Sequence, residues 1–462
     1  MASNNGVEVE IVARETIKPS KPTPSNLKTF TFSRIDQFIP PIYFPLIFFY
    51  PYIDHLVVAK ERSLLLKASL SNVLTRYHPF AGRIKDHVSI ECNDEGVLFV
   101  EARVNGVLFD VLQHPNVEQL KKFIPSEPQS ENIAMGNLLF HSLRLFLKFY
   151  YLICFANTNI FSVTLQGNLI LVQVNFFQCG GMAIGLCFSH KLADATTIAT
   201  FMKDWASTTL KSDTEVLVHP EFIAASLFPP VDQMFPPNNQ APRRISVRRR
   251  FVFDESNIVA LKALASSTGN QQPTRVEAVT ALIWNCAVKT SRSILGPSRP
   301  SLCFHAVNLR KRFSPPLSEH TIGNLLGAFV AQIEETHEIG LQNLVSQLRK
   351  EKQEFRVTGD TEKLFKVDVM ARFGQTKDVD IFSFTSWCRM PLYEADFGWG
   401  KPIWVAPIRT IDPHVVMLVD TRDGDGIEAW VYLTQEEMTI FECDQELLSF
   451  ASMNPSVLSE PF

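Results

Sequence analysis

The 462-residue sequence has no paired cysteines, no excess of positive charge and none of the common cofactor-binding motifs. Its eight cysteines form no C-x-x-C pair and no metal-ligand spacing, which predicts reduced thiols and no bound metal. A formal net charge of -4 supplies no broad attraction for nucleic acid or for an anionic membrane surface. We therefore expect neither a nucleic-acid partner nor a metal site.

A secretion signal and a membrane-spanning segment are also missing. The N-terminus is acidic and polar, whereas a signal peptide needs a basic start and an apolar core. The apolar stretch 38–53 contains four prolines that would break a spanning helix, so we expect extended core segments there. A second apolar stretch, 138–156, is interrupted by His141, Arg144 and Lys148, which are costly at membrane depth. These features predict a cytosolic protein without a membrane span.

Several catalytic signatures are absent as well. The sequence has no G-x-S-x-G nucleophile motif, no G-x-G-x-x-G dinucleotide motif and no phosphate-binding P-loop. It also lacks H-E-x-x-H. These absences argue against a serine hydrolase of that type, a nucleotide-dependent enzyme and a zinc protease.

The first half of the chain alternates between helical and strand-like patterns. Apolar residues recur at helical spacing in 62–78 and stop at Pro79, which predicts an amphipathic helix. The stretch 90–104 indicates two strands around a turn at 93–96, and the alternation in 171–177 indicates another strand. The first half therefore has an αβ pattern.

A segment rich in proline and polar residues, 213–245, divides the chain. The second half then shows a strand and two helices, at 248–253, 255–266 and 274–289. We expect two αβ domains of similar size, 1–212 and 246–462, with 213–245 as a crossover linker.

His190 and Asp194 lie four residues apart, between an apolar, glycine-rich run and a predicted helix. The helix is indicated by apolar residues at i, i+3, i+4 and i+7: Ile198, Phe201, Met202 and Trp205. Glycines leave room for a backbone or a ligand to approach closely: Gly180, Gly181 and Gly185. An imidazole of pKa near ~6.5 is suited to deprotonating an alcohol or an amine. The spacing alone is a weak motif, so His190 is either a general base or a structural histidine.

A second candidate is the loop formed by Asp396, Phe397, Gly398, Trp399 and Gly400. An acid, two aromatic rings and two glycines in five residues predict a tight loop pinned by buried rings and one ion pair. By itself such a loop is more typical of a structural turn than of a catalytic site.

Together, HKLAD in the first half and DFGWG in the second resemble the motifs of the plant BAHD acyltransferases. Members of this family transfer acyl groups from coenzyme A thioesters to alcohols or amines. Further matching segments lie along nearly the whole chain, at 35–37 (IDQ), 77–83, 90–104, 274–284, 306–312 and 424–433. The sequence is most similar to the vinorine synthase-like subgroup of alkaloid and alcohol acetyltransferases.

The resemblance implies an α/β fold of two chloramphenicol-acetyltransferase-like domains with mixed sheets and an active-site channel at their interface. It implies acetyl-CoA as cosubstrate, a small-molecule alcohol as acceptor, no permanently bound cofactor and a monomeric enzyme. A non-catalytic acyl-CoA or small-molecule binding protein that kept the fold, and an N-acyltransferase of the same family, are the alternatives.

The resemblance also implies site residues. His190 matches the general base, and Asp194 matches a carboxylate that pairs with Arg310 and holds the base in place. Thr385, Ser386 and Trp387 match a segment that supports the cosubstrate and the reaction intermediate. Asp396 matches a loop aspartate that is sometimes counted as catalytic, and we interpret its role as structural. The rest of that loop supports the site: Phe397, Gly398, Trp399 and Gly400.

One residue departs from the family pattern, and the role of one arginine cluster has two interpretations. Ala195 stands where glycine is usual after the motif aspartate, and alanine tolerates ordinary helical dihedrals, so we expect little effect. An arginine cluster lies near the linker: Arg243, Arg244, Arg248, Arg249 and Arg250. It either attracts coenzyme A phosphates or is a solvated loop that enters a strand.

Residues 138–168 have no counterpart in the family pattern. The tripeptide GNL occurs at 136–138 and again at 167–169, offset by 31 residues, and deletion of 138–168 restores a clean entry into the strand 171–177. The segment is apolar without a helical or alternating period. We expect a translated retained intron or an in-frame insertion, with a genuine surface insertion as the alternative.

Overall fold

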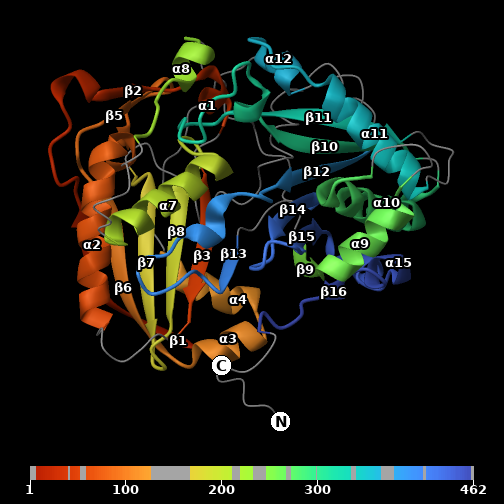
Figure 1. The fold of residues 1–462 in the computed structure, drawn as a ribbon, viewed down its shortest axis with the longest axis horizontal. Coiled ribbons are helices and arrows are strands. Elements are labelled where there is room, and N and C mark those ends of the chain that lie inside the picture. The colour runs from red at the N-terminus through yellow and green to blue at the C-terminus, as the bar shows by residue number, and fades with distance from the viewer. Residues whose placement is uncertain are drawn as a thin grey trace.

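The computed structural model describes residues 7–39, 42–51, 59–125, 167–210, 219–232, 246–266, 272–297, 299–333, 340–365, 379–408 and 413–458. In this part of the chain, two large mixed sheets lie side by side, each covered by helices (Figure 1). Each sheet is associated with its own large cluster of buried apolar side chains. The predicted mixed α/β fold with two sheet-rich domains is confirmed.

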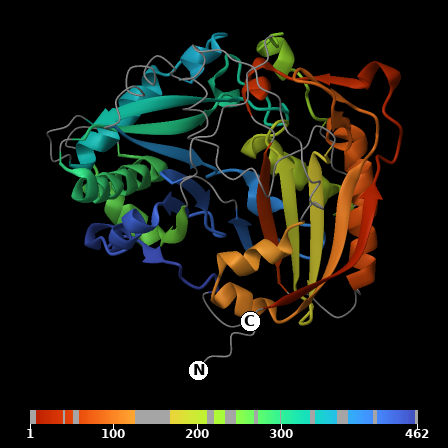
Figure 2. The same cartoon turned by 180° about the vertical axis from the view of Figure 1, so that it is seen from behind.

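The first sheet has the strand order β1-β6-β7-β8-β3-β13. Its strands are β1 (Glu8–Ile17), β3 (Tyr43–Tyr50), β6 (Val97–Asn105), β7 (Ile170–Phe177), β8 (Met182–Ser189) and β13 (Trp404–Pro407). The pair β6 and β7 is parallel and the other neighbours are antiparallel. Helices α2 (Ala59–Arg76) and α7 (Ala195–Leu210) cover one face of this sheet, and Figure 2 shows the opposite face.

The second sheet has the strand order β11-β10-β12-β14-β15-β9-β16. Its strands are β9 (Val247–Phe253), β10 (Ser301–Asn308), β11 (Leu326–Ile333), β12 (Asp380–Ser386), β14 (Val415–Asp420), β15 (Ile427–Leu433) and β16 (Ser452–Met453). Strands β10, β12 and β14 are parallel neighbours. The helices of this half are α9 (Glu255–Leu264), α10 (Arg275–Leu295), α11 (Leu341–Glu354), α12 (Thr361–Leu364), α14 (Gln435–Phe441) and α15 (Gln445–Leu448).

Smaller elements complete the described fold. A three-stranded sheet contains β2 (Thr29–Thr31), β4 (Arg83–Ile84) and β5 (Ser89–Glu91). The short α-helices are α1 (Arg34–Phe38), α3 (Leu108–Gln113), α4 (Val117–Leu120) and α8 (Ala224–Leu227). The 3-10 turns are η1 (Ser25–Leu27), η2 (His78–Ala81), η3 (Lys121–Phe123), η4 (Arg310–Arg312) and η5 (Pro391–Glu394).

Strand β13 belongs to the second half of the sequence but pairs with β3 of the first sheet. Its Trp404 stacks on Phe49 of β3 at a centroid distance of 5.4 Å. Trp404 also stacks on Trp430 of β15, at 6.0 Å. The buried Trp404 ring therefore contacts both sheets. A single boundary in the sequence does not separate the two sheets, because β13 follows the linker in sequence but belongs to the first sheet.

The local predictions in the first half that fall on described residues are confirmed, and the structure adds how the strands pair. Helix α2 buries the predicted face, and α7 begins at Ala195, directly after Asp194. The turn at 93–96 does connect two strands, β5 and β6. These strands belong to different sheets, so they do not form a hairpin.

Strand β7 is buried on both faces, although its sequence alternates between apolar and polar residues. The polar side chains satisfy backbone groups of a neighbouring segment: Gln173 donates to the Lys122 carbonyl at 2.9 Å, and Asn175 donates to the Phe123 carbonyl at 2.8 Å. A Cβ atom at Gly185 would lie 2.0 Å from the Phe123 carbonyl oxygen. Gly185 therefore allows close approach of a backbone segment.

None of the helices in the described ranges combines the length and the apolar character that a membrane crossing needs. The predicted extended core segment is present as β3, in which every residue is buried. Apart from Gly167 and Asn168, the segment 138–168 lies outside the described residues, as does much of the linker 213–245.

Candidate active site

His190 is the first residue after β8, and the short turn that follows leads into α7. Asp194 caps this helix, because its Oδ1 atom accepts the backbone N–H of Thr197 at 2.9 Å. His190 is half-buried and Asp194 is buried. The motif residues thus occupy the strand-to-helix connection that the sequence predicts.

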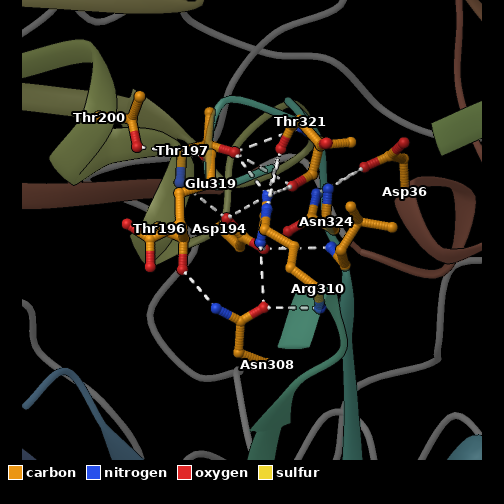
Figure 3. Close-up of polar contacts among 12 residues, drawn as sticks. Asp36, Asp194, Thr196, Thr197, Thr200, Asn308, Arg310, Glu319, Thr321 and Asn324 are labelled. Carbon is orange, nitrogen blue, oxygen red and sulfur yellow. Dashed lines mark hydrogen bonds and ion pairs between the residues drawn. The ribbon is translucent and has the colours of Figure 1, made fainter. Parts of the chain in front are cut away.

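Asp194 forms a buried, bidentate ion pair with Arg310, which follows β10 in the second half of the chain (Figure 3). Arg310 Nη1 donates to Asp194 Oδ2 at 2.7 Å, and Nη2 donates to Oδ1 at 3.2 Å. Burial raises the pKa of Asp194, but Arg310, together with the backbone N–H groups of Thr197 and Leu325, holds the pKa below its ordinary value. The structure therefore contains the expected pair.

The remaining donors of Arg310 organise the loop before β11. Nε and Nη2 donate to the Thr321 carbonyl at 2.9 and 2.7 Å, and Nη2 also donates to the Gly323 carbonyl at 3.1 Å. The backbone N–H of Leu325 donates to Asp194 Oδ2 at 3.1 Å. The Asp194 carboxylate, the Arg310 guanidinium and the loop before β11 are thus linked by hydrogen bonds. These bonds connect the turn after His190 with the second half of the chain.

Aromatic rings connect His190 with the predicted segment 385–387. The ring of Phe44 in β3 and the ring of His190 are nearly perpendicular, at a centroid distance of 6.4 Å. Phe44 also contacts Trp387, at 4.8 Å. Thr385 and Ser386 end β12 and are half-buried, whereas Trp387 is buried. His190 and Trp387 thus share Phe44 as a neighbour.

The loop 396–400 lies at the other end of α7. Phe397 packs edge-on against Trp205, at 5.0 Å, and a Cβ atom at Gly398 would lie 3.2 Å from Leu210, the last residue of α7. A 16-residue helix is about 24 Å long, so the structure does not bring Asp396 to His190.

The expected ion pair of this loop is not found among the described residues. Asp396 Oδ1 instead accepts the backbone N–H groups of Gly398 and Gly400, at 2.8 and 2.9 Å. The two glycines have φ values of 101° and 94°, which side chains of L residues rarely adopt. Phe397 and Trp399 are buried and stack on each other, at 5.6 Å. The predicted buried rings are confirmed, and the carboxylate closes the turn.

The described members of the arginine cluster bind groups of the protein itself. Arg249 pairs with Glu442 at 2.7 Å, and the buried Arg250 pairs with Glu428 at 2.7 Å. Arg248 donates to the Tyr432 hydroxyl at 3.1 Å and borders a cavity of about 620 Å³. Arg243 and Arg244 lie outside the described residues.

Three potential metal ligands gather near α15: the atoms of Cys286, Asp444 and Glu446 lie within 4.8 Å of one another. The Lys289 ammonium group binds Glu446 at 2.6 Å, and Asp444 caps α15. Burial raises the pKa of the Cys286 thiol well above its ordinary value. A structural role accounts for these groups.

Three residues near His190 were not singled out individually from the sequence. Phe44 is hidden in an apolar stretch, and Asp36 occurs only as part of the IDQ segment. Asn324 accompanies no motif. Their positions depend on pairing between distant segments, which no local pattern reports.

Comparison with known proteins identifies the family of the chain. The model of the "Transferase family" matches residues 7–142 and 156–448. The chain is 35% identical to epi-neemfruitin B 7-O-acetyltransferase of Melia azedarach, over 97% of this chain and 100% of that protein. It is also 35% identical to 17,18-epoxy-17-hydroxycur-19-ene N-malonyltransferase of Strychnos nux-vomica, over 96% and 91%.

Among solved structures, vinorine synthase superimposes with a TM-score of 0.82. Its sequence is 34% identical, and the match covers 98% of this chain and 100% of vinorine synthase. The enzyme of that name from Rauvolfia serpentina is likewise 34% identical. The chain therefore belongs to this transferase family, the BAHD acyltransferases, and is an acyl-CoA-dependent acyltransferase.

Proposed function

We propose that this acyltransferase moves an acetyl group from acetyl-CoA to a hydroxyl group of a plant specialised metabolite, with His190 as general base. The observation that carries the proposal is the buried Asp194–Arg310 pair, which ties the connection after His190 to the second half of the chain. Relatives named as acetyltransferases of limonoids and alkaloids support acetyl as the acyl group.

In the proposed reaction, His190 accepts the hydroxyl proton while the acceptor oxygen attacks the thioester carbonyl. A carbon–oxygen bond forms, the carbon–sulfur bond breaks, and the proton passes from His190 to the departing coenzyme A sulfur. Trp387 and His190 both contact Phe44, and we assign Trp387 and the adjacent Thr385 and Ser386 to holding the thioester and its oxyanion. Asp194 and Arg310 position the base, and Asp396 has a structural role.

The thiol nearest in sequence to this segment, Cys388, is a poor candidate for carrying an acyl group. Burial raises the pKa of Cys388 to about 12, and Asp420 adds to the shift. A thiol of that pKa is a poor nucleophile at neutral pH because little thiolate is present. Cys388 is therefore not a suitable acceptor for an acetyl group.

We further propose a monomeric, cytosolic enzyme without a membrane or nucleic-acid partner, in which 1–212 and 246–462 are the two domains and 213–245 is the crossover. An N-acyltransferase is the second candidate, because the Strychnos relative is named as an N-malonyltransferase.

The test is release of free coenzyme A thiol by the purified enzyme, with acetyl-CoA or malonyl-CoA and a panel of alkaloid and terpenoid alcohols and amines. We expect release that depends on an alcohol. His190→Ala should lower kcat by about 10²- to 10⁴-fold and leave the KM for acetyl-CoA nearly unchanged, since the imidazole supplies proton abstraction.

The matched control is His87→Ala, which removes a half-buried histidine whose ring contacts the Asp232 carbonyl, and it should keep normal turnover. Near-normal turnover of His190→Ala would contradict the base assignment. No thiol release by the wild type with any acceptor would favour a binding protein instead.

A further inference from the structure

The main chain of His190 is held on both sides by segments that are distant in sequence. Its N–H donates to the carbonyl of Ile42, just before β3, at 2.7 Å. Its carbonyl accepts a hydrogen bond from Nδ2 of Asn324, in the loop before β11, at 2.9 Å. These two bonds fix the backbone from which the imidazole projects.

The amide of Asn324 is in turn oriented by Asp36. Asn324 Nδ2 donates to Asp36 Oδ1 at 2.8 Å (Figure 3). The same Nδ2 atom donates to the His190 carbonyl. If the side-chain amide of Asn324 were rotated by 180°, its oxygen would face two acceptors, Asp36 Oδ1 and the His190 carbonyl. The Asp36 carboxylate therefore favours the orientation in which the NH2 group faces His190. Oδ1 of Asn324 has no donor among the described residues, so the side chain contributes only these two hydrogen bonds.

Asp36 is itself fully engaged and buried. Its Oδ1 also accepts the backbone N–H of Asn324 at 2.8 Å, and its Oδ2 accepts the N–H and the hydroxyl of Ser33 at 2.8 and 2.6 Å. Burial raises the pKa of Asp36, although hydrogen bonds from Ser33 and Asn324 oppose the shift. Both Asp36 and Asn324 have an exposed fraction of 0%, so no solvent competes for these bonds.

We propose that Asp36 and Asn324 are positioning residues for acyl transfer: the carboxylate orients the amide, and the amide sets the position of the His190 backbone. The inference rests on the proposed role of His190 as base. It differs from the role of Asp194 and Arg310, which act on the connection after His190 rather than on His190 itself. A displacement of the base by about 1 Å is enough to cost about 10²-fold in rate.

The main test is Asn324→Leu, which keeps approximately the same volume and removes both hydrogen bonds. We expect kcat to fall about 10- to 100-fold, while the KM for acetyl-CoA stays within about twofold. The matched control is Asn175→Leu, because Asn175 is equally buried and donates to the carbonyls of Phe123 and Ala183, far from His190 in the first sheet. This control should lower Tm and keep kcat.

The double variant separates positioning from general destabilisation. Once His190→Ala has removed the base, Asn324→Leu should cause no further loss of the residual rate, because it acts through that base. An equal loss in both backgrounds would overturn the proposal. If Asn324→Leu does not fold, Asn324→Asp preserves the shape, and even in its protonated form one hydrogen cannot serve both acceptors; kcat should fall again.

The outcomes also separate this inference from the proposed function. Full turnover of His190→Ala would remove the proposed function and this inference with it. Normal kcat of a folded Asn324→Leu variant, beside an inactive His190→Ala variant, would overturn the positioning role alone.

Discussion

Lys191, the residue after the base, carries a buried ammonium group. Nζ donates to the carbonyls of Gln37 and Ile39 at 2.8 and 2.9 Å and lies 5.4 Å from the centroid of the Phe32 ring. Burial lowers the pKa of Lys191 to about 8, although the Asp36 carboxylate acts in the opposite direction. The charged form of Lys191 is thus less favoured in the folded protein than in the unfolded chain.

This pKa predicts a pH dependence of stability. Between pH 8 and the ordinary lysine pKa of 10.5, the unfolded chain keeps a proton that the folded chain has released, so the free energy of unfolding rises with pH. From pH 7 to 10.5, the wild type should gain on the order of 3 kcal/mol relative to Lys191→Met. Urea unfolding across this range measures the difference.

The matched control is Lys203→Met, which removes an exposed lysine of α7 and should leave the pH dependence of wild type unchanged. Parallel curves for wild type and Lys191→Met would contradict the prediction.

Single residues near the site were predictable where a motif marks them. His190, Asp194 and the loop 396–400 have distinctive local spacing. Asn324 and Asp36 have none, because their role arises only when the loop before β11 and the turn at α1 meet in the fold. A hydrogen bond between residues that are far apart in sequence, such as Asp36 and Asn324, cannot be predicted from the local sequence around either residue.

At the scale of elements, apolar periodicity predicted several of the helices, and the structure adds how they are capped. Thr274 and Glu277 form a complete capping box at the start of α10, and Asp194 caps α7. Strand partners were not predictable, because β5 and β6 are neighbours in sequence but join different sheets. Local preference decides whether a strand forms, whereas its partner depends on long-range packing.

Helix α7 begins at a cap that is also half of a buried ion pair. Asp194→Asn and Arg310→Ala should each destabilise the protein by about 3 to 5 kcal/mol, because each leaves a buried partner with its charge uncompensated. Both should also reduce activity, since the connection after His190 loses its anchor. Urea unfolding of each variant at neutral pH measures the effect.

Asp254→Asn provides the control for the capping role alone. Asp254 is exposed and caps α9 by accepting the Asn257 N–H at 2.7 Å, without a buried arginine. Its replacement should cost about 1 kcal/mol or less. Equal losses for Asp194→Asn and Asp254→Asn would show that the ion pair adds nothing to the cap.

At the scale of the whole molecule, the described residues include two further links between the halves besides the Asp194–Arg310 pair. Strand β13 completes the first sheet, and the described part of the linker pairs Glu221 with Thr321, next to the Arg310 loop. Both depend on contacts between residues far apart in sequence. The family resemblance predicted two domains, but composition and periodicity alone could not assign β13 to the first sheet.

The described end of the segment 138–168, Gly167 and Asn168, directly precedes Leu169 and β7. Asn168 accepts a hydrogen bond from Arg83 at 3.1 Å through Oδ1 and one from the Tyr43 hydroxyl through its carbonyl, and Leu169 is buried. Because GNL occurs at both ends, deletion of 138–168 gives the same sequence as deletion of 136–166. The shortened chain therefore keeps an asparagine at this position and loses no residue that the structure describes.

We therefore predict that the chain without 138–168 is at least as soluble and as active in acetyl transfer as the full chain. The control is deletion of 136–168, which removes both copies of the Gly-Asn pair and with them the contacts to Arg83 and Tyr43; it should have a lower Tm than the 138–168 deletion. Sequencing of the transcript across this junction provides a second, independent measurement, because a retained intron is absent from the spliced form. A transcript that always contains the segment, together with higher activity of the long form, would identify it as a functional part of the enzyme.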